Sequence, residues 1–158
     1  MSNKKNNLDR ILECIEDIDF ILTDSNLKIT QALEHRILKP AIRMNIVIIA
    51  EQFKNLQDKL EFEVLENFTK EDLKGISAVR NYIAHDYDST DDNIIEGVIR
   101  YHLPTIKTTI EEIKSKNLEN IVAMHEKSLE KDSSNSESKE LSQDQNEDST
   151  KSKVRRER

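Results

Sequence analysis

Residues 41–60 read AIRMNIVIIAEQFKNLQDKL and form the longest apolar-periodic segment of this 158-residue chain. Large apolar side chains recur in it at alternating spacings of four and three, at Ile42, Ile46, Ile49, Phe53, Leu56 and Leu60. This spacing predicts a helix with one packed face, and a second apolar strip follows Ala41, Met44, Val47 and Ile48. We expect such a helix to be central in a bundle or shared with a partner chain.

Shorter helical patterns lie on both sides of this segment. Residues 8–22 place their apolar side chains on one helical stripe, which predicts an amphipathic helix. Thr69 followed by Asp72 is typical of a helix N-cap, and Ser89 followed by Asp92 repeats the pattern before a last long helix.

The composition favours a helical protein throughout. Only two Gly and two Pro are present, so the chain lacks the turn residues that a many-stranded β fold requires. Pro40 predicts a kink or a fresh helix start, and Pro104 is a candidate kink in the last helix. The fold class predicted from the sequence is all-α, an antiparallel bundle of four to five helices.

The character of the chain changes near Lys127. Residues 127–158 hold two Leu and one Val among mostly Ser, Glu, Lys, Asp and Gln. Such a segment buries too little apolar surface to offset the entropy lost on ordering. We predict a helical domain at 1–126 and a disordered, solubilising polar tail at 127–158, whose basic end KSKVRRER is an alternative contact for RNA or an acidic partner.

Charge and cysteine content exclude several classes of protein. The formal net charge of −7 counts against non-specific coating of nucleic acid, although a local basic cleft is compatible with it. The single Cys14, expected to be a buried small hydrophobe, leaves no intramolecular disulfide and no Cys-based metal site. No apolar run is long enough for a membrane span, so we expect a cytoplasmic location and no membrane partner.

The stretch AVRNYIAHDYDSTDD, residues 78–92, gathers the candidate catalytic groups at the end of a helical pattern. Arg80 and His85 are five residues apart, which places them about 140° apart around an ideal helix. One unbroken helix would not point both at the same atom. Either the helix ends near His85, or two chains meet so that the Arg of one faces the His of the other.

An Arg–His pair suits cleavage of an RNA phosphodiester. The guanidinium of Arg80 grips phosphate and stabilises charge that develops in the transition state. An imidazole such as that of His85 can take or give the proton. RNA supplies its own nucleophile, the 2′-hydroxyl, so neither a catalytic Ser nor a metal is needed. His35, His102 and His125 share no metal-ligand spacing, and we expect no metal and no cofactor.

The motif, Arg followed directly by Asn, then His five residues after the Arg and Tyr two residues later, resembles the signature of the HEPN superfamily. More closely, the chain resembles HepT-like toxins, helical ribonucleases that are partners of MNT-type nucleotidyltransferase antitoxins. The resemblance covers roughly residues 8–115. It includes IVIIAEQFKNL (46–56), LKGISAVRNYIAHDY (73–87) and DDNIIEGVIRYHLPTI (91–106) in their order and spacing.

This resemblance implies a role for each motif residue. Arg80 would bind and polarise the scissile phosphate, His85 would be the general acid–base group, and Asn81 would support the site. The antitoxin would use ATP to transfer AMP to Tyr87, adding bulk and negative charge beside Arg80 and so inhibiting the toxin. The resemblance also implies a homodimer in which two motif helices form one cleft. It offers no role for the long polar tail.

Other interpretations of the same residues stay open at this point. The main alternative is a non-catalytic HEPN module that docks a nucleotidyltransferase and helps it bind nucleotide or substrate, and a plain dimerisation scaffold is a third. Tyr82 is expected to be an aromatic residue at the edge of the core. Arg36, Lys39 and Arg43 are expected to form a solvated basic stripe, or alternatively to flank an RNA path or meet the antitoxin.

Overall fold

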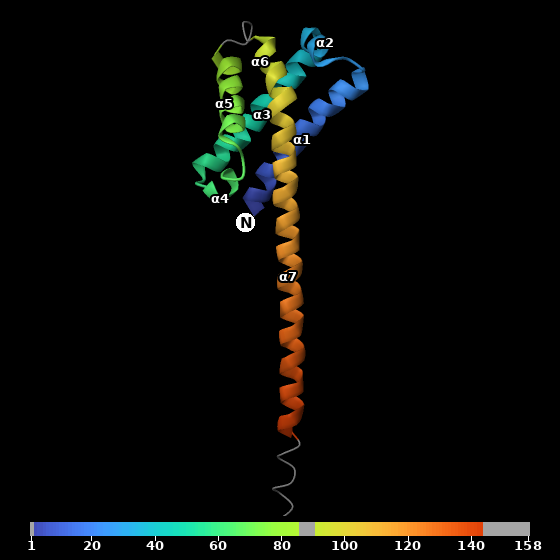
Figure 1. Ribbon diagram of the computed structural model, residues 1–158, viewed down its shortest axis with the longest axis vertical. Coiled ribbons are helices and arrows are strands. Elements are labelled where there is room, and N and C mark those ends of the chain that lie inside the picture. Colours follow the sequence, from blue (N-terminus) through green and yellow to red (C-terminus); the bar gives the residue numbers. More distant parts are fainter. Residues whose placement is uncertain (1, 86–90, 144–158) are drawn as a thin grey trace, which may run out of the picture. The chain divides into compact units, whose positions relative to one another are not determined.

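The protein has an all-α fold, which confirms the predicted class. The computed structural model describes the backbone of residues 2–85 and 91–143, and the side chains of residues 7–85 and 91–131. Every regular element within these ranges is a helix. They are α1 (Ser2–Ser25), α2 (Ile29–Glu34), α3 (Leu38–Asp58), α4 (Phe62–Leu65), α5 (Lys70–His85), α6 (Asp92–Gly97), the π-helical turn η1 (Val98–His102) and α7 (Leu103–Gln143) (Figure 1).

Helix α3 is central, because it packs against α1, α2, α4 and α5. Its predicted seam is buried from Ile42 to Leu56, whereas Met44 on the second strip remains exposed. The assignment of Leu60 to this seam was wrong: α3 ends at Asp58, and Leu60 is 69% exposed. Leu60 has a φ of 57°, the left-handed conformation with which helices commonly end.

Pro40 marks a fresh helix start, as one of the two expectations stated. It lies in the first turn of α3, where the missing N–H would have had no intrahelical partner. The same helix start is capped by the imidazole of His35. Its Nδ1 accepts the backbone N–H groups of Ile37 and Leu38 at 3.2 and 3.3 Å.

Near Pro104 the helix changes from a π-helical to an α-helical hydrogen-bond pattern. The turn η1 directly precedes α7, and the Leu103 N–H donates to the Val98 carbonyl, five residues back. Pro104 has no N–H to donate to the residue four positions earlier, so a wider turn relieves the mismatch. The expected irregularity is therefore present as a π-helical turn.

Helix α5 packs against η1 through a close polar contact. The Nδ1 atom of His102 lies 2.7 Å from Oδ1 of Asp72, which is buried. A Cβ atom at Gly75 would lie only 2.8 Å from Nε2 of His102, so glycine leaves the space that the ring occupies. His102 is thus a partly buried structural residue, as predicted.

The packed unit ends at Ile113. Beyond it, α7 continues to Gln143, past residue 127, where a disordered tail was predicted to begin. Side chains are exposed throughout Lys114–Lys131, including those of Leu118, Ile121 and Met124. Disorder of the tail and a boundary at residue 126 stay predictions. Within the described ranges, no helix is long and apolar enough to cross a membrane.

Candidate active site

Helix α5 carries the motif residues Arg80, Asn81 and His85 and turns its two sides to different surroundings. The Oγ1 atom of Thr69 accepts the backbone N–H of Asp72 at 3.1 Å, which is the predicted N-cap interaction. Ile76, Val79 and Ile83 then face the core. Because these residues recur every three or four positions, the polar residues between them are directed away from the core.

Arg80 reaches from α5 to α3 and pairs with Glu51. Its Nε donates to Oε1 of Glu51 at 2.6 Å, and Nη2 lies 2.5 Å from the same oxygen. The Arg80 side chain is 32% exposed and that of Glu51 is 41% exposed. The guanidinium is therefore held in one direction while about a third of the side chain remains exposed to solvent.

Glu51 was absent from the site residues predicted from the sequence. It follows the Ile-rich run in IVIIAEQFKNL, which was noted only as part of the family resemblance. Glu51 lies one position after buried Ala50 and two after buried Ile49, at the edge of the packed face of α3. The available signal in the sequence was a carboxylate directly after an apolar run.

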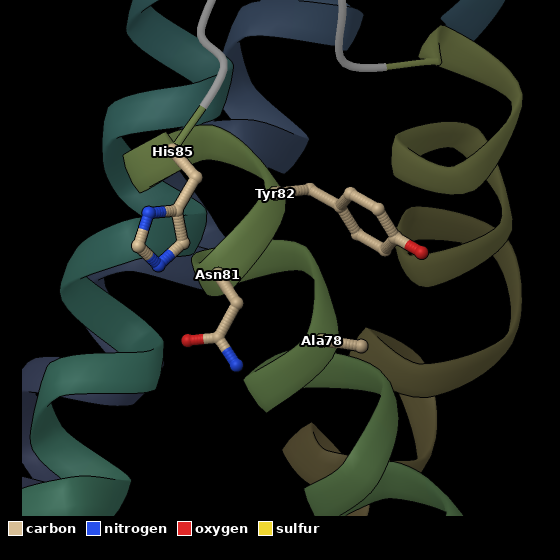
Figure 2. A pocket seen from close by; sticks show the side chains of 4 residues that line it. All are labelled: Ala78, Asn81, Tyr82 and His85. Carbon is tan, nitrogen blue, oxygen red and sulfur yellow. The ribbon is translucent and has the colours of Figure 1, made fainter.

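A second surface of α5, named here the α5 notch, is lined by Ala78, Asn81, Tyr82 and His85. It is a hollow of about 410 Å³. Figure 2 shows His85 and Tyr82 leaving the helix toward opposite sides, with Asn81 and Ala78 between them. Tyr82 is 53% exposed, so its expected position at the core edge was wrong.

Arg80 and His85 line different hollows. Arg80 and Glu51 belong to a groove of about 240 Å³ between α3 and α5, which Met44 and Ile83 also line. His85 belongs to the α5 notch. The angular separation expected from helical geometry is thus present within one chain. Tyr87, the predicted AMP acceptor, lies outside the described residues.

A second ion cluster joins α6 to α3. Oδ2 of Asp92 lies 2.8 Å from Nζ of Lys39, and its Oδ1 lies 3.0 Å from Nη2 of Arg43. Burial by itself would raise the pKa of Asp92, but the hydrogen bonds and charges of Lys39 and Arg43 outweigh it and lower that pKa.

This cluster corrects two predictions. Arg43 is only 1% exposed, so Arg36, Lys39 and Arg43 do not form a solvated stripe. The N-cap of α6 is Asp91, whose carboxylate accepts the Asn93 N–H at 2.9 Å, instead of the predicted Ser89. Asp92, which was predicted to act as the partner in the cap at Ser89, instead turns its carboxylate toward Lys39 on α3.

The described residues of the motif do not belong to a group of candidate metal ligands. Within the ranges that the structure describes, no three His, Cys, Asp or Glu side chains are arranged to hold an ion. The side chains of Asn81, Tyr82 and His85 make no hydrogen bond with another described residue. Among the described residues, α5 therefore presents an oriented guanidinium on one side and, on the other, three polar or aromatic groups that make no hydrogen bond with one another or with the rest.

Comparison with known families finds a match to the family described as ribonuclease HepT-like over residues 11–113. The matched part is more than half of the chain. It extends from α1 into the first turns of α7 and includes both the α3 seam and the α5 motif. Searches of curated proteins and of solved structures find no match.

Proposed function

We propose that this chain, which belongs to the ribonuclease HepT-like family of the HEPN superfamily, is the ribonuclease toxin of a toxin–antitoxin pair. Ribonuclease activity in general is what membership of this family implies. The proposed reaction needs no metal. The 2′-hydroxyl of RNA attacks the adjacent phosphorus, the bond to the 5′-oxygen breaks, and a 2′,3′-cyclic phosphate remains.

The observation that carries this proposal is the oriented, partly exposed guanidinium of Arg80 on the helix that also bears His85. Arg80, fixed by Glu51, would bind the scissile phosphate and stabilise the charge that builds up on its oxygens. His85 would accept the 2′-hydroxyl proton and return a proton to the leaving 5′-oxygen. Asn81, one residue after Arg80, would support the phosphate or the flanking nucleotide.

The placement of Arg80 and His85 in separate hollows favours an active site that two protomers share. Within one chain, Arg80 opens onto the α3–α5 groove and His85 onto the α5 notch. A homodimer that sets two α5 helices face to face would let Arg80 of one protomer act with the partner's His85. A stable monomer at micromolar concentration, observed by light scattering, would contradict this arrangement.

Regulation would come from a nucleotidyltransferase antitoxin, with which HepT-like proteins generally pair. The proposed inhibition is transfer of AMP from ATP to the hydroxyl of Tyr87, with pyrophosphate leaving. The added phosphate would compete with RNA for Arg80. If Tyr87→Phe still gains the mass of AMP when incubated with the antitoxin and ATP, this acceptor is wrong.

The first test is induction of the protein alone in a bacterium, wild type beside His85→Ala. We expect the wild type to arrest growth and His85→Ala, expressed to the same level, to permit it. Purified wild type should also cut RNA in the presence of a metal chelator. Equal growth of both strains, with no cleavage in vitro, would overturn the proposal.

A second candidate is a non-catalytic module that docks a nucleotidyltransferase. The ion pair between Arg80 and Glu51 favours it, because the carboxylate already neutralises the guanidinium that would otherwise bind phosphate. This candidate predicts that His85→Ala leaves the association with the nucleotidyltransferase unchanged and that neither form cuts RNA.

A further inference from the structure

The α5 notch contains groups that cleavage of a phosphodiester does not by itself require. Ala78, Asn81, Tyr82 and His85 follow one another by three, one and three positions, so they form one stripe of the helix. An amide and a phenol ring on this stripe have no hydrogen-bonding partner among the described residues. The same hollow contains the proposed acid–base group, His85.

We propose that the α5 notch binds the nucleobase adjacent to the scissile phosphate and prefers adenine. The inference rests on the proposed ribonuclease function and assigns its substrate specificity. The ring of Tyr82 stacks on the base, and the amide of Asn81 forms hydrogen bonds with the edge of the base. Because Ala78 is small, it leaves room for the base in the notch.

The exposure of Tyr82 is the first argument. At 53% exposure Tyr82 is not part of the core, and it makes no hydrogen bond to another described residue, so about half of its surface is open to a ligand. Sequence-specific recognition of RNA relies on unstacked bases placed against such aromatic rings. Each stacked base contributes enough binding that its loss lowers affinity roughly 5- to 150-fold.

The amide of Asn81 gives the preference. An Asn side chain can donate to N7 and accept from the N6 amino group of adenine at the same time. The corresponding edge of guanine presents two acceptors, so the amide oxygen would face a like group. Asn81 is exposed and one helical turn from His85, which puts base recognition next to the acid–base group.

The dimensions of the notch are compatible with this occupant. A hollow of about 410 Å³ is at the smaller end of the range of roughly 300–1,000 Å³ that ligand sites occupy. His85 and Tyr82 diverge on either side of Asn81 and Ala78 (Figure 2).

The test maps cleavage positions in a pool of single-stranded RNA of random sequence. Wild type should cut preferentially beside adenine. Tyr82→Ala should lower cleavage roughly 5- to 150-fold, with Tyr82→Phe restoring most of it. Tyr101→Ala is the matched control, because Tyr101 is also an exposed tyrosine, at 72%, but lies on η1 outside the notch.

Asn81→Asp tests the preference itself. A carboxylate only accepts hydrogen bonds, so it loses adenine N7 and gains the two donors of the guanine Watson–Crick edge. We expect the ratio of cleavage beside adenine to cleavage beside guanine to fall about tenfold or more. The comparison of ratios removes any uniform loss of rate caused by the added negative charge. An unchanged ratio would overturn the proposal.

A binding measurement separates this proposal from the ribonuclease function. Oligoadenylate and oligouridylate with 2′-methoxy groups cannot be cut, and their affinities are measured by fluorescence anisotropy. Adenylate binding that falls in Tyr82→Ala supports the notch even if wild type cuts no RNA. Cleavage by wild type together with equal binding of both oligomers, unaffected by Tyr82→Ala, overturns the notch and leaves the ribonuclease intact.

The remaining occupant to exclude is a second copy of the chain. If Tyr82→Ala dissociates the dimer in sedimentation velocity and lowers cleavage equally beside all four bases, the notch is a protein interface and the proposal is wrong. If Tyr82→Ala remains dimeric and loses cleavage chiefly beside adenine, the base occupies it.

Discussion

Arg43 and Arg80 both connect α3 to another helix through a carboxylate, yet they offer solvent very different surfaces. Arg43 extends from α3 to Asp92 at the start of α6, and its side chain is 2% exposed. Arg80 extends from α5 to Glu51 on α3, and its side chain is 32% exposed. The first pair holds the bundle together, whereas the second leaves a positioned cation within reach of a ligand.

The difference shows how burial separates a structural charge from a functional one. A buried guanidinium is costly to desolvate and depends on its partners, so it cannot exchange Asp92 for an incoming anion. A partly exposed ion pair contributes little to stability, and one of its partners can be shared with phosphate. If this distinction is correct, the two pairs should fail in opposite ways when they are broken.

The largest expected effect is on the activity of Arg80→Ala. Removal of a charge-stabilising donor should lower RNA cleavage roughly 100- to 1,000-fold. The free energy of unfolding should change by less than about 1 kcal/mol, because the pair with Glu51 is partly exposed. Cleavage assays and urea denaturation measure the two quantities, with Arg100→Ala as control, since Arg100 is also partly exposed, at 47%, and pairs with Glu96. Normal cleavage by Arg80→Ala would contradict the distinction between a structural Arg43 and a functional Arg80.

The second effect is the destabilisation of Asp92→Asn. Arg43 would lose the opposite charge beside it while remaining buried. Removal of one partner of a fully buried pair costs about 3–5 kcal/mol. Because Asp92 is 36% exposed and an amide oxygen still accepts hydrogen bonds, we expect about 1–3 kcal/mol here. Urea denaturation at neutral pH measures it, and an unaltered midpoint would mean that Arg43 does not depend on this carboxylate.

The same pair predicts a dependence of stability on pH. The pKa of Asp92 is lowered in the folded protein, so folding favours the ionised carboxylate. Its contribution is complete above the unfolded pKa of about 3.9 and is lost as the pH falls through the folded pKa. The difference in unfolding free energy between wild type and Asp92→Asn should therefore shrink below about pH 4. A constant difference from neutral pH to acid would contradict this assignment.

A third polar pair, Asp72 with His102, is structural like the pair of Arg43 with Asp92. In Gly75→Ala the new Cβ would lie 2.8 Å from Nε2 of His102, so the ring must move and its contact with Asp72 lengthens. Such overpacking costs about 1–3 kcal/mol. Gly97→Ala is the matched control, because a Cβ there meets nothing within 4 Å. Thermal unfolding of both variants measures the difference.

Much of the fold could be predicted because it depends on periodicity. The alternating spacings of four and three in α3, and the Thr69 cap of α5, are short-range patterns that the sequence displays directly. Leu60 fits the spacing of the seam although the helix ends at Asp58. The spacing of apolar residues does not show where a helix ends. The burial of Arg43 was equally hidden, since it depends on a partner forty-nine residues away.

The candidate site was predictable only in its residue types. The spacing of Arg80 and His85 gave their separation around the helix, and they do line different hollows. Glu51 was missed because its contact with Arg80 spans twenty-nine residues and arises from the packing of α3 on α5. Tyr82 was misjudged because an aromatic residue on an amphipathic helix is equally compatible with the core edge and with open solvent.

The smallest expected change in stability is that of Glu51→Gln, and it tests whether Glu51 orients Arg80 or merely neutralises it. The pair is partly exposed on both sides, so the unfolding free energy should change by less than about 1 kcal/mol. If Glu51 orients the guanidinium, cleavage should fall about tenfold, because Arg80 must then be ordered by the substrate itself. If Glu51 only competes with phosphate, cleavage should rise instead and the orienting role is wrong. Glu96→Gln, which weakens the pair of Glu96 with Arg100 away from the motif, should leave cleavage unchanged. A fall in Glu51→Gln alone would then depend on the position of the carboxylate and not merely on the loss of a negative charge.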